Sequence, residues 1–194
     1  MKKTLLAVLA FALTMTSVQA ADTVRVLLQT SDGAITLELN AKQAPLSTAN
    51  FVQYVKDGHY DGLVFHRVIP GFMIQGGGYD KNYVERPTRA AIPNEAKNGL
   101  KNVRGTVAMA RTSNPDSATS QFFINLVDNH FLDYPGQDGW GYAVFGKVVK
   151  GMDVVDKIGN APTRSGAPFG RDIPVKPVVI EKATMVEDKP SSRP

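Results

Sequence analysis

The feature that most constrains the fold is a succession of short apolar runs bounded by turn residues. In residues 23–40, apolar and polar residues alternate on both sides of Asp32-Gly33, a strong signal for a tight hairpin turn. Further strand-like runs occupy residues 63–69, 72–77, 105–110, 120–127, 142–149 and 177–186. Because strands do not alternate with long helices and no internal repeat occurs, the pattern predicts a closed or sandwiched antiparallel sheet.

Two segments have helical spacing instead. Residues 45–57 open with Pro45, repeat apolar residues at helical intervals and end before Gly58. A second helical pattern covers residues 151–159. One helix near each end of the chain could close the two openings of a barrel, so the element order favours a mainly β barrel with two covering helices over a sandwich.

The first 20 residues have the composition of a secretory signal. Basic residues precede an apolar run from Leu5 to Leu13, and Val18 and Ala20 occupy the small-residue positions before a cut. The run is shorter than the roughly 20 apolar residues that span a bilayer. An uncleaved anchor is the alternative, although nothing like a stop-transfer segment follows. We predict cleavage after Ala20 and one mature domain, residues 21–194, with a polar tail from about residue 187.

Composition limits the partners. Without Lys2 and Lys3, the 22 basic residues fall to 20 against 18 acidic ones, a balance that gives no case for binding nucleic acid or a membrane. The chain has no cysteine, so disulfides, thiol chemistry and cysteine-bound metals are excluded. A leader of this kind together with the absence of disulfides suits a bacterial periplasm, where we expect a monomer that is free of the membrane after cleavage.

The common catalytic constellations are missing. His59, His66 and His130 form no i, i+4 pair and have no carboxylate at metal spacing, so no metal site is predicted. There is no G-x-S-x-G elbow, and the glycines at 76–78 are not followed by the G-K-[S/T] of a phosphate loop. No cofactor is expected.

The most apolar passage, residues 65–75, nevertheless contains a guanidinium and an amide. Strand alternation places Phe65 and Arg67 on one face, with His66 on the other. The same alternation and the turn at residues 70–71 predict a single face that gathers Arg67, Met73, Gln75, Gln121 and Phe123. Such a face offers stacking surface and fixed donors, but no nucleophile or proton shuttle.

A structural explanation of the same residues stays open at this point. Arg67 could lay its stem over the core or pair with Glu85 or Asp80. Phe72, Met73 and Phe123 would then be ordinary core residues.

Residues 65–77, "FHRVIPGFMIQGG", resemble the signature of the cyclophilins, the cyclosporin-class peptidyl-prolyl cis-trans isomerases. The segments "APLSTANFVQYV", "GTVAMAR", "SATSQFFINL", "FLD" and "YAVFGKVVKGMDVVDKI" are similar to further family motifs, and they occur in the family order within residues 24–186. Together with the leader, they resemble the periplasmic cyclophilins of Gram-negative bacteria.

The resemblance implies a closed eight-stranded antiparallel barrel capped by two α-helices, with a groove that binds extended or unfolded polypeptides around proline. By position, Arg67 corresponds to the catalytic arginine, and Phe72 and Gln75 are assigned with it as catalytic. The substrate-binding positions are Phe65, Met73, Ala110, Arg111, Thr112, Gln121, Phe123, Phe131, Leu132 and Tyr142.

Three positions depart from many eukaryotic members, which have tryptophan in place of Phe131, histidine in place of Tyr142 and asparagine in place of Arg111. Phe131 lacks the indole N–H, so we expect only weak cyclosporin binding. The loop at residues 134–141 is longer than the turn of many relatives, and its role stays open.

These observations predict a peptidyl-prolyl isomerase that assists the folding of exported proteins. A non-catalytic chaperone that binds proline peptides on the same barrel is the main alternative. A structural barrel that assembles with partners through its edge is a third possibility.

Overall fold

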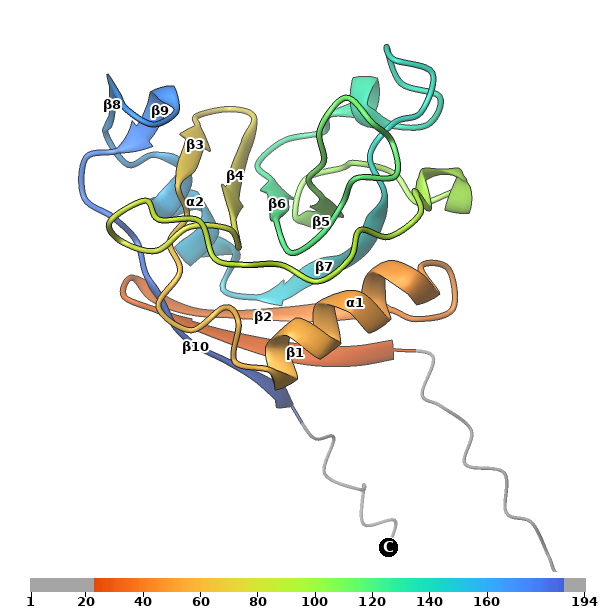
Figure 1. The fold of residues 1–194 in the computed structure, drawn as a ribbon, viewed down its shortest axis with the longest axis horizontal. Helices are drawn as coiled ribbons and strands as arrows, with labels where there is room; N and C mark the ends of the chain where they lie inside the picture. The colour runs from red at the N-terminus through yellow and green to blue at the C-terminus, as the bar shows by residue number, and fades with distance from the viewer. Residues whose placement is uncertain (1–22, 187–194) are drawn as a thin grey trace, which may run out of the picture.

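The computed structural model describes residues 23–186, so the expected leader and polar tail lie outside the described residues. One antiparallel sheet has the strand order β10-β1-β2-β7-β5-β6-β4-β3 (Figure 1). Its strands are β1 (Thr23–Thr30), β2 (Gly33–Asn40), β3 (Arg67–Ile69), β4 (Met73–Gly76), β5 (Thr106–Met109), β6 (Phe122–Asn125), β7 (Val144–Lys150) and β10 (Ile180–Val186). A separate hairpin consists of β8 (Thr163–Gly166) and β9 (Gly170–Pro174). The helices are α1 (Pro45–Lys56), α2 (Met152–Gly159) and the 3₁₀ turns η1 (Ala96–Asn98) and η2 (His130–Leu132).

The predicted hairpin is confirmed. β1 and β2 pair from Thr23↔Asn40 to Thr30↔Gly33, on either side of the turn at Asp32. The inward side chains of both strands have no exposed surface: Val26, Leu28, Ile35, Leu37 and Leu39. The alternating apolar residues of the sequence therefore form the inner face of the sheet.

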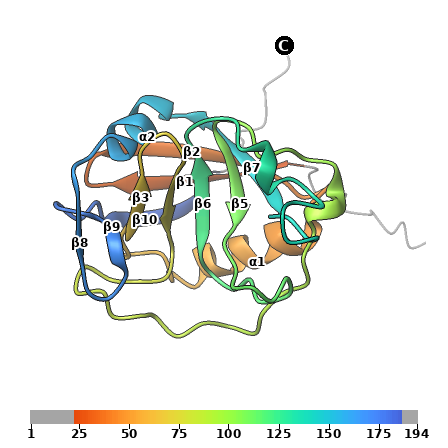
Figure 2. The same ribbon diagram turned by 90° about the horizontal axis from the view of Figure 1, so that it is seen from above.

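Both predicted helices are also confirmed. Figure 2 shows α1 and α2 on opposite sides of the strands, where α1 packs on β10, β2 and β7, and α2 on β2, β4 and β3. α1 begins at Pro45 without a capping side chain of its own. Instead, the Glu95 carboxylate accepts the N–H groups of Leu46 and Ser47 at 2.9 and 2.7 Å, which satisfies free donors at the positive end of the helix.

The main core lies between the helices and the sheet and is rich in aromatic side chains. Phe122 contacts Phe51 and Tyr60 edge-on, with ring centroids 5.3 and 5.6 Å apart. A smaller cluster of Met73, Ala108, Phe123, Leu132 and Val144 lies apart from this core. Since Phe122 and Phe123 are neighbours on β6, the strand separates the two clusters.

The expectation of a closed barrel is slightly overstated. β3 and β10 are the ends of the sheet order. β3 has only three residues, too few to continue the ladder across to β10. The segments that precede the two strands meet through the isolated bridge Val64↔Val179 and through the Phe65 N–H, which donates to the Val178 carbonyl at 3.0 Å.

Within residues 23–186, no helix has the length and apolar character that crossing a membrane requires.

Candidate functional site

A cavity of about 470 Å³ opens beside strands β3 to β6. Its lining consists of His66, Arg67, Phe72, Met73, Gln75, Tyr79, Ala110, Arg111, Gln121, Phe123, Leu132, Tyr142 and Phe169. Most of the predicted site residues are in this set. The structure therefore brings together side chains from five separate segments of the chain.

Strand register explains this convergence. Arg67 pairs with Gln75 across β3 and β4, and Gln75 pairs with Phe123 across β4 and β6. Paired residues of adjacent antiparallel strands point to the same side of the sheet. The predicted common face of Arg67, Gln75 and Phe123 is confirmed, as are the places of Met73 and Gln121 on it.

A polar chain crosses the cavity floor. The Arg67 Nη1 donates to Gln75 Oε1 at 3.4 Å, and the Gln75 Nε2 donates to Gln121 Oε1 at 3.0 Å. The Arg67 side chain is 37% exposed, so these contacts leave guanidinium surface accessible from the cavity. The arginine is held in orientation while donors remain available to a ligand.

The carboxylate partner of Arg67 is Asp172, whereas the sequence suggested Glu85 or Asp80. Arg67 Nε and Asp172 Oδ2 are 3.7 Å apart. Asp172 lies on β9 with a φ of +64°. The sequence reading missed the β8–β9 hairpin because its strands are mostly polar; Gly166 and Gly170, which flank its turn, were the available signal.

The structure corrects the predicted faces of Phe65 and His66. Phe65 is fully buried in the main core, 6.1 Å from Phe122, and is not part of the groove. His66 lines the cavity beside Arg67. Regular alternation fails here because β3 begins only at Arg67, while the preceding residues bond to the segment before β10.

The His66 ring is enclosed by the rings of Tyr79 and Phe169, with centroids 4.8 and 4.9 Å away. Burial, and to a lesser degree the charge of Arg67, lowers the pKa of His66 from 6.5 to about 4. At neutral pH the imidazole is therefore uncharged, and Arg67 is the cation of this pair.

An apolar wall faces the polar chain. The Phe72 ring stacks on Phe131 at 5.7 Å, and the Phe123 ring meets Tyr142 edge-on at 5.8 Å. Phe131 is 48% exposed and lines an adjoining cavity of about 270 Å³ with Leu132 and Tyr142. Phe131 is thus at the rim of the groove.

Thr112 lines a second adjoining cavity, of about 280 Å³, with Gln75, Ala110, Arg111 and Gln121. The predicted substrate-binding residues therefore divide among three connected hollows, apart from Phe65 in the core. The central cavity is lined by Arg67, Gln75 and Gln121, and each smaller hollow shares lining residues with it.

The glycines after Gln75 allow neighbouring groups to approach the backbone closely. A Cβ on Gly78 would lie 2.7 Å from the Gln121 side chain. Gly77 has a φ of +88°, and a Cβ there would lie 2.8 Å from the Ser120 carbonyl oxygen. These two positions let the loop pack directly beneath the amide of Gln121.

Chemically, the arrangement offers fixed hydrogen-bond donors opposite an apolar wall. Among residues 23–186, His, Asp and Glu side chains form no group of three or more that could hold a metal ion. Donors and stacking surface suit a ligand that is bound and distorted rather than covalently attacked.

Comparison with known proteins agrees with this geometry. The family model described as cyclophilin type peptidyl-prolyl cis-trans isomerase/CLD matches residues 25–185. Peptidyl-prolyl cis-trans isomerase A of Dickeya dadantii is 51% identical over 191 residues, covering 96% of this chain and 100% of the relative. Peptidyl-prolyl cis-trans isomerase B of Escherichia coli is 52% identical over 161 residues, covering 81% of this chain and 97% of the relative.

Among solved structures, a cyclophilin type peptidyl-prolyl cis-trans isomerase of Cryptosporidium parvum aligns with a TM-score of 0.70 at 26% identity, covering 86% of this chain and 99% of that one. The same protein solved in the presence of the dipeptide Ala-Pro aligns with a TM-score of 0.69, covering 84% of this chain and 99% of that one. The fold, the groove and the family match lead to one conclusion: the chain belongs to the cyclophilin-type peptidyl-prolyl cis-trans isomerases and is an isomerase of X–Pro peptide bonds.

Proposed function

We propose that this isomerase acts on proline-containing exported polypeptides in the bacterial periplasm and so assists their folding, with Arg67 as the catalytic donor. The signal-like composition of residues 1–20 supports the location, and a chain without cysteine needs no disulfide there. The observation that carries the chemistry is a partly exposed guanidinium, held by Gln75 and Asp172, opposite an apolar wall.

The reaction needs a donor in this place. Rotation about an X–Pro bond has a barrier of about 18–20 kcal/mol because it breaks amide resonance. In the twisted transition state, the prolyl nitrogen regains a lone pair that the planar isomers lack. A donor aimed at that nitrogen stabilises the transition state selectively. The Arg67 guanidinium suits this task because it stays protonated and presents its N–H groups in a fixed fork.

The size of the rate acceleration that an isomerase needs indicates that Arg67 does not act alone. An acceleration of three to four decades requires about 4–5.5 kcal/mol, while one charge-assisted hydrogen bond contributes about 1.5–3 kcal/mol. The remainder is assigned to the apolar wall of Phe72, Met73, Phe123 and Leu132. This wall excludes water, which strengthens the bond from Arg67, and holds the proline ring so that the X–Pro bond is twisted.

The test is cis-to-trans isomerisation of a short X–Pro peptide by residues 21–194 and by the Arg67→Ala variant. We expect kcat/KM to fall about 10- to 100-fold, the value of one charge-assisted bond, with an unchanged circular dichroism spectrum. Arg89→Ala is the matched control, since it removes an exposed arginine that pairs with Asp57 on the edge of α1, away from the groove.

An unaffected rate in Arg67→Ala would remove Arg67 from the mechanism. Peptide binding without turnover in the unaltered chain would leave the non-catalytic chaperone. The location has a separate test, in which the full chain is expressed in a Gram-negative host. The periplasmic fraction should contain a protein whose mass corresponds to residues 21–194. An intact chain in the membrane fraction would contradict export by cleavage.

A further inference from the structure

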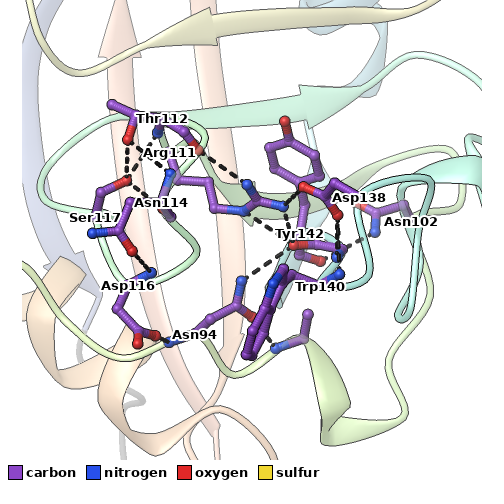
Figure 3. Close-up of polar contacts among 12 residues, drawn as sticks. Asn94, Asn102, Arg111, Thr112, Asn114, Asp116, Ser117, Asp138, Trp140 and Tyr142 are labelled. Carbon is purple, nitrogen blue, oxygen red and sulfur yellow. Dashed lines mark hydrogen bonds and ion pairs between the residues drawn. The ribbon is translucent and has the colours of Figure 1, made fainter.

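Arg111 is a buried cation in the groove wall. Its side chain is only 2% exposed. The guanidinium forms an ion pair with Asp138, donates to the Gly141 carbonyl from Nη2 at 2.9 Å and from Nε at 3.2 Å, and donates to the Thr112 carbonyl at 3.0 Å (Figure 3). Its carbon lies 4.3 Å from the centre of the Tyr142 ring. All these donors are used within the protein, which distinguishes Arg111 from a free ligand-binding arginine.

These contacts anchor the loop at residues 134–141. Asp138 holds the loop internally, since its Oδ1 accepts the N–H groups of Trp140 and Gly141 at 3.0 and 3.1 Å. The other carboxylate oxygen receives Arg111. Gly141 has a φ of +70°, and a Cβ there would lie 2.7 Å from the Tyr134 nitrogen, so the two ends of the loop are in close contact. The guanidinium therefore binds the loop where it closes.

The anchored end of the loop continues into the groove wall. The Tyr142 N–H donates to the Leu132 carbonyl at 2.8 Å, and both side chains line the central cavity and the adjoining hollow of about 270 Å³. One side of the Tyr142 ring faces Arg111, and Phe123 meets the ring edge-on. Removing the guanidinium would take away the ion pair to the loop and the cation beside the ring, while Asn94 would still donate to the Gly141 carbonyl at 3.2 Å.

The local electrostatics favour a lasting attachment. Hydrogen bonds from Arg111, and then from the N–H groups of Gly141 and Trp140, hold the pKa of Asp138 well below its usual range. A buried charge that loses its partner is strongly unfavourable, so removing Asp138 would leave the Arg111 charge buried without its ion pair. Removing Arg111 instead leaves Asp138, whose side chain is 44% exposed, without its bond to the groove wall.

We propose that Arg111 is a positioning residue: through Asp138 and Gly141 it holds the loop at residues 134–141 and the Tyr142 ring in place, and so shapes the groove wall that receives the polypeptide. This role rests on the proposed function. Because the guanidinium contacts the wall and not the reacting bond, its loss acts on substrate binding more than on rotation.

The experiment uses Trp140, the only tryptophan of the chain, as a reporter within the loop. For residues 21–194 and the variants Arg111→Ala, Arg111→Lys and Asp138→Ala, we would measure Trp140 anisotropy, acrylamide quenching, and KM and kcat for a short X–Pro peptide. In Arg111→Ala we expect lower anisotropy, stronger quenching, a KM raised about tenfold and a kcat within about twofold. Arg111→Lys should recover only part of both signals, since lysine lacks the planar fork.

The double variant of Arg111 and Asp138 should resemble Arg111→Ala, because two residues that act as a unit are non-additive. Arg89→Ala should leave every signal unchanged. A mobile Trp140 with normal KM would show that the loop does not shape the groove, and a loss confined to kcat would place Arg111 in the rotation step. Either result overturns the proposal, as does an unchanged Trp140 signal.

Failure of the proposed function can be distinguished from failure of the positioning role. If the unaltered chain binds the peptide without turning it over, calorimetric Kd values replace KM in the same comparison. A tenfold weaker Kd in Arg111→Ala would then still support the positioning role, and an unchanged Kd would refute it.

Discussion

At the scale of the residue, the two arginines Arg67 and Arg111 have different roles because their surroundings differ. Arg67 and Arg111 both line the central cavity, yet 37% of one side chain and 2% of the other are exposed. Arg67 keeps donor surface toward the cavity, while Arg111 uses its donors on the protein. The guanidinium of the first is open to a ligand in the cavity, and that of the second is bound to the groove wall.

His66 carries a prediction at this scale. Because its pKa falls from 6.5 unfolded to about 4 folded, the unfolded chain binds more protons between these values. The contribution of His66 to the free energy of unfolding should therefore be fully present above about pH 6.5. It should fall by up to about 3 kcal/mol as the pH falls toward 4. Urea unfolding of the unaltered chain and of His66→Gln, from pH 4 to 7, measures the difference; equal slopes for the two proteins would contradict it.

At the scale of the element, strands β3, β4 and β6 set the row of site residues, and loops complete it. The hairpin β8–β9 is an example: it is separate from the main sheet, yet it supplies the carboxylate beside Arg67 and the ring of Phe169 beside His66. Its polar strands lack the periodicity that identifies β1 and β2, so its role emerges only from its contacts.

The two glycines after β4 should differ in what alanine changes: stability at Gly77 and peptide binding at Gly78. Gly77→Ala should cost at least about 1–3 kcal/mol, because a φ of +88° strains an L-residue and the new Cβ would meet the rigid Ser120 carbonyl. In Gly78→Ala the three atoms nearest the new Cβ all belong to the Gln121 side chain, which can rotate away, so the change should cost less than about 1 kcal/mol of stability but displace the amide and raise KM.

Thermal unfolding and peptide kinetics on both glycine variants test this contrast. Equal losses of stability would refute the assignment, as would a Gly78→Ala enzyme with unchanged KM.

At the scale of the whole molecule, the sheet divides a main core from a smaller cluster under the groove. Phe122 points into the first and Phe123 into the second. Phe122 contacts Phe51 of α1 and thereby joins helix to sheet. We therefore expect stability to depend mainly on one face of β6 and peptide binding on the other.

Phe122→Ala should lower the free energy of unfolding by about 3–5 kcal/mol, the usual loss for a buried phenylalanine. Phe123→Ala should cost less, since one side of its ring borders an open cavity, but it should reduce kcat/KM more. Urea denaturation and peptide isomerisation on the two variants check this, with the exposed Val84→Ala as a neutral control. A larger loss of stability in Phe123→Ala would contradict the division.

The sequence alone determined the features that depend on near neighbours. The β1–β2 hairpin, both helices and the shared face of Arg67, Gln75 and Phe123 follow from periodicity and turn residues, and the ordered motifs identified the family. These signals are local because side-chain direction repeats every two residues in a strand and every 3.6 in a helix.

Only the tertiary structure decided the rest. Asp172 reaches Arg67 from a hairpin about a hundred residues further along the chain, and Asp138 reaches Arg111 from a loop 27 residues away. The incomplete closure of the barrel and the exchange of Phe65 and His66 between core and groove depend on where a three-residue strand begins. Local periodicity cannot predict such contacts, since they form only when the sheet brings distant segments within a few ångströms of one another.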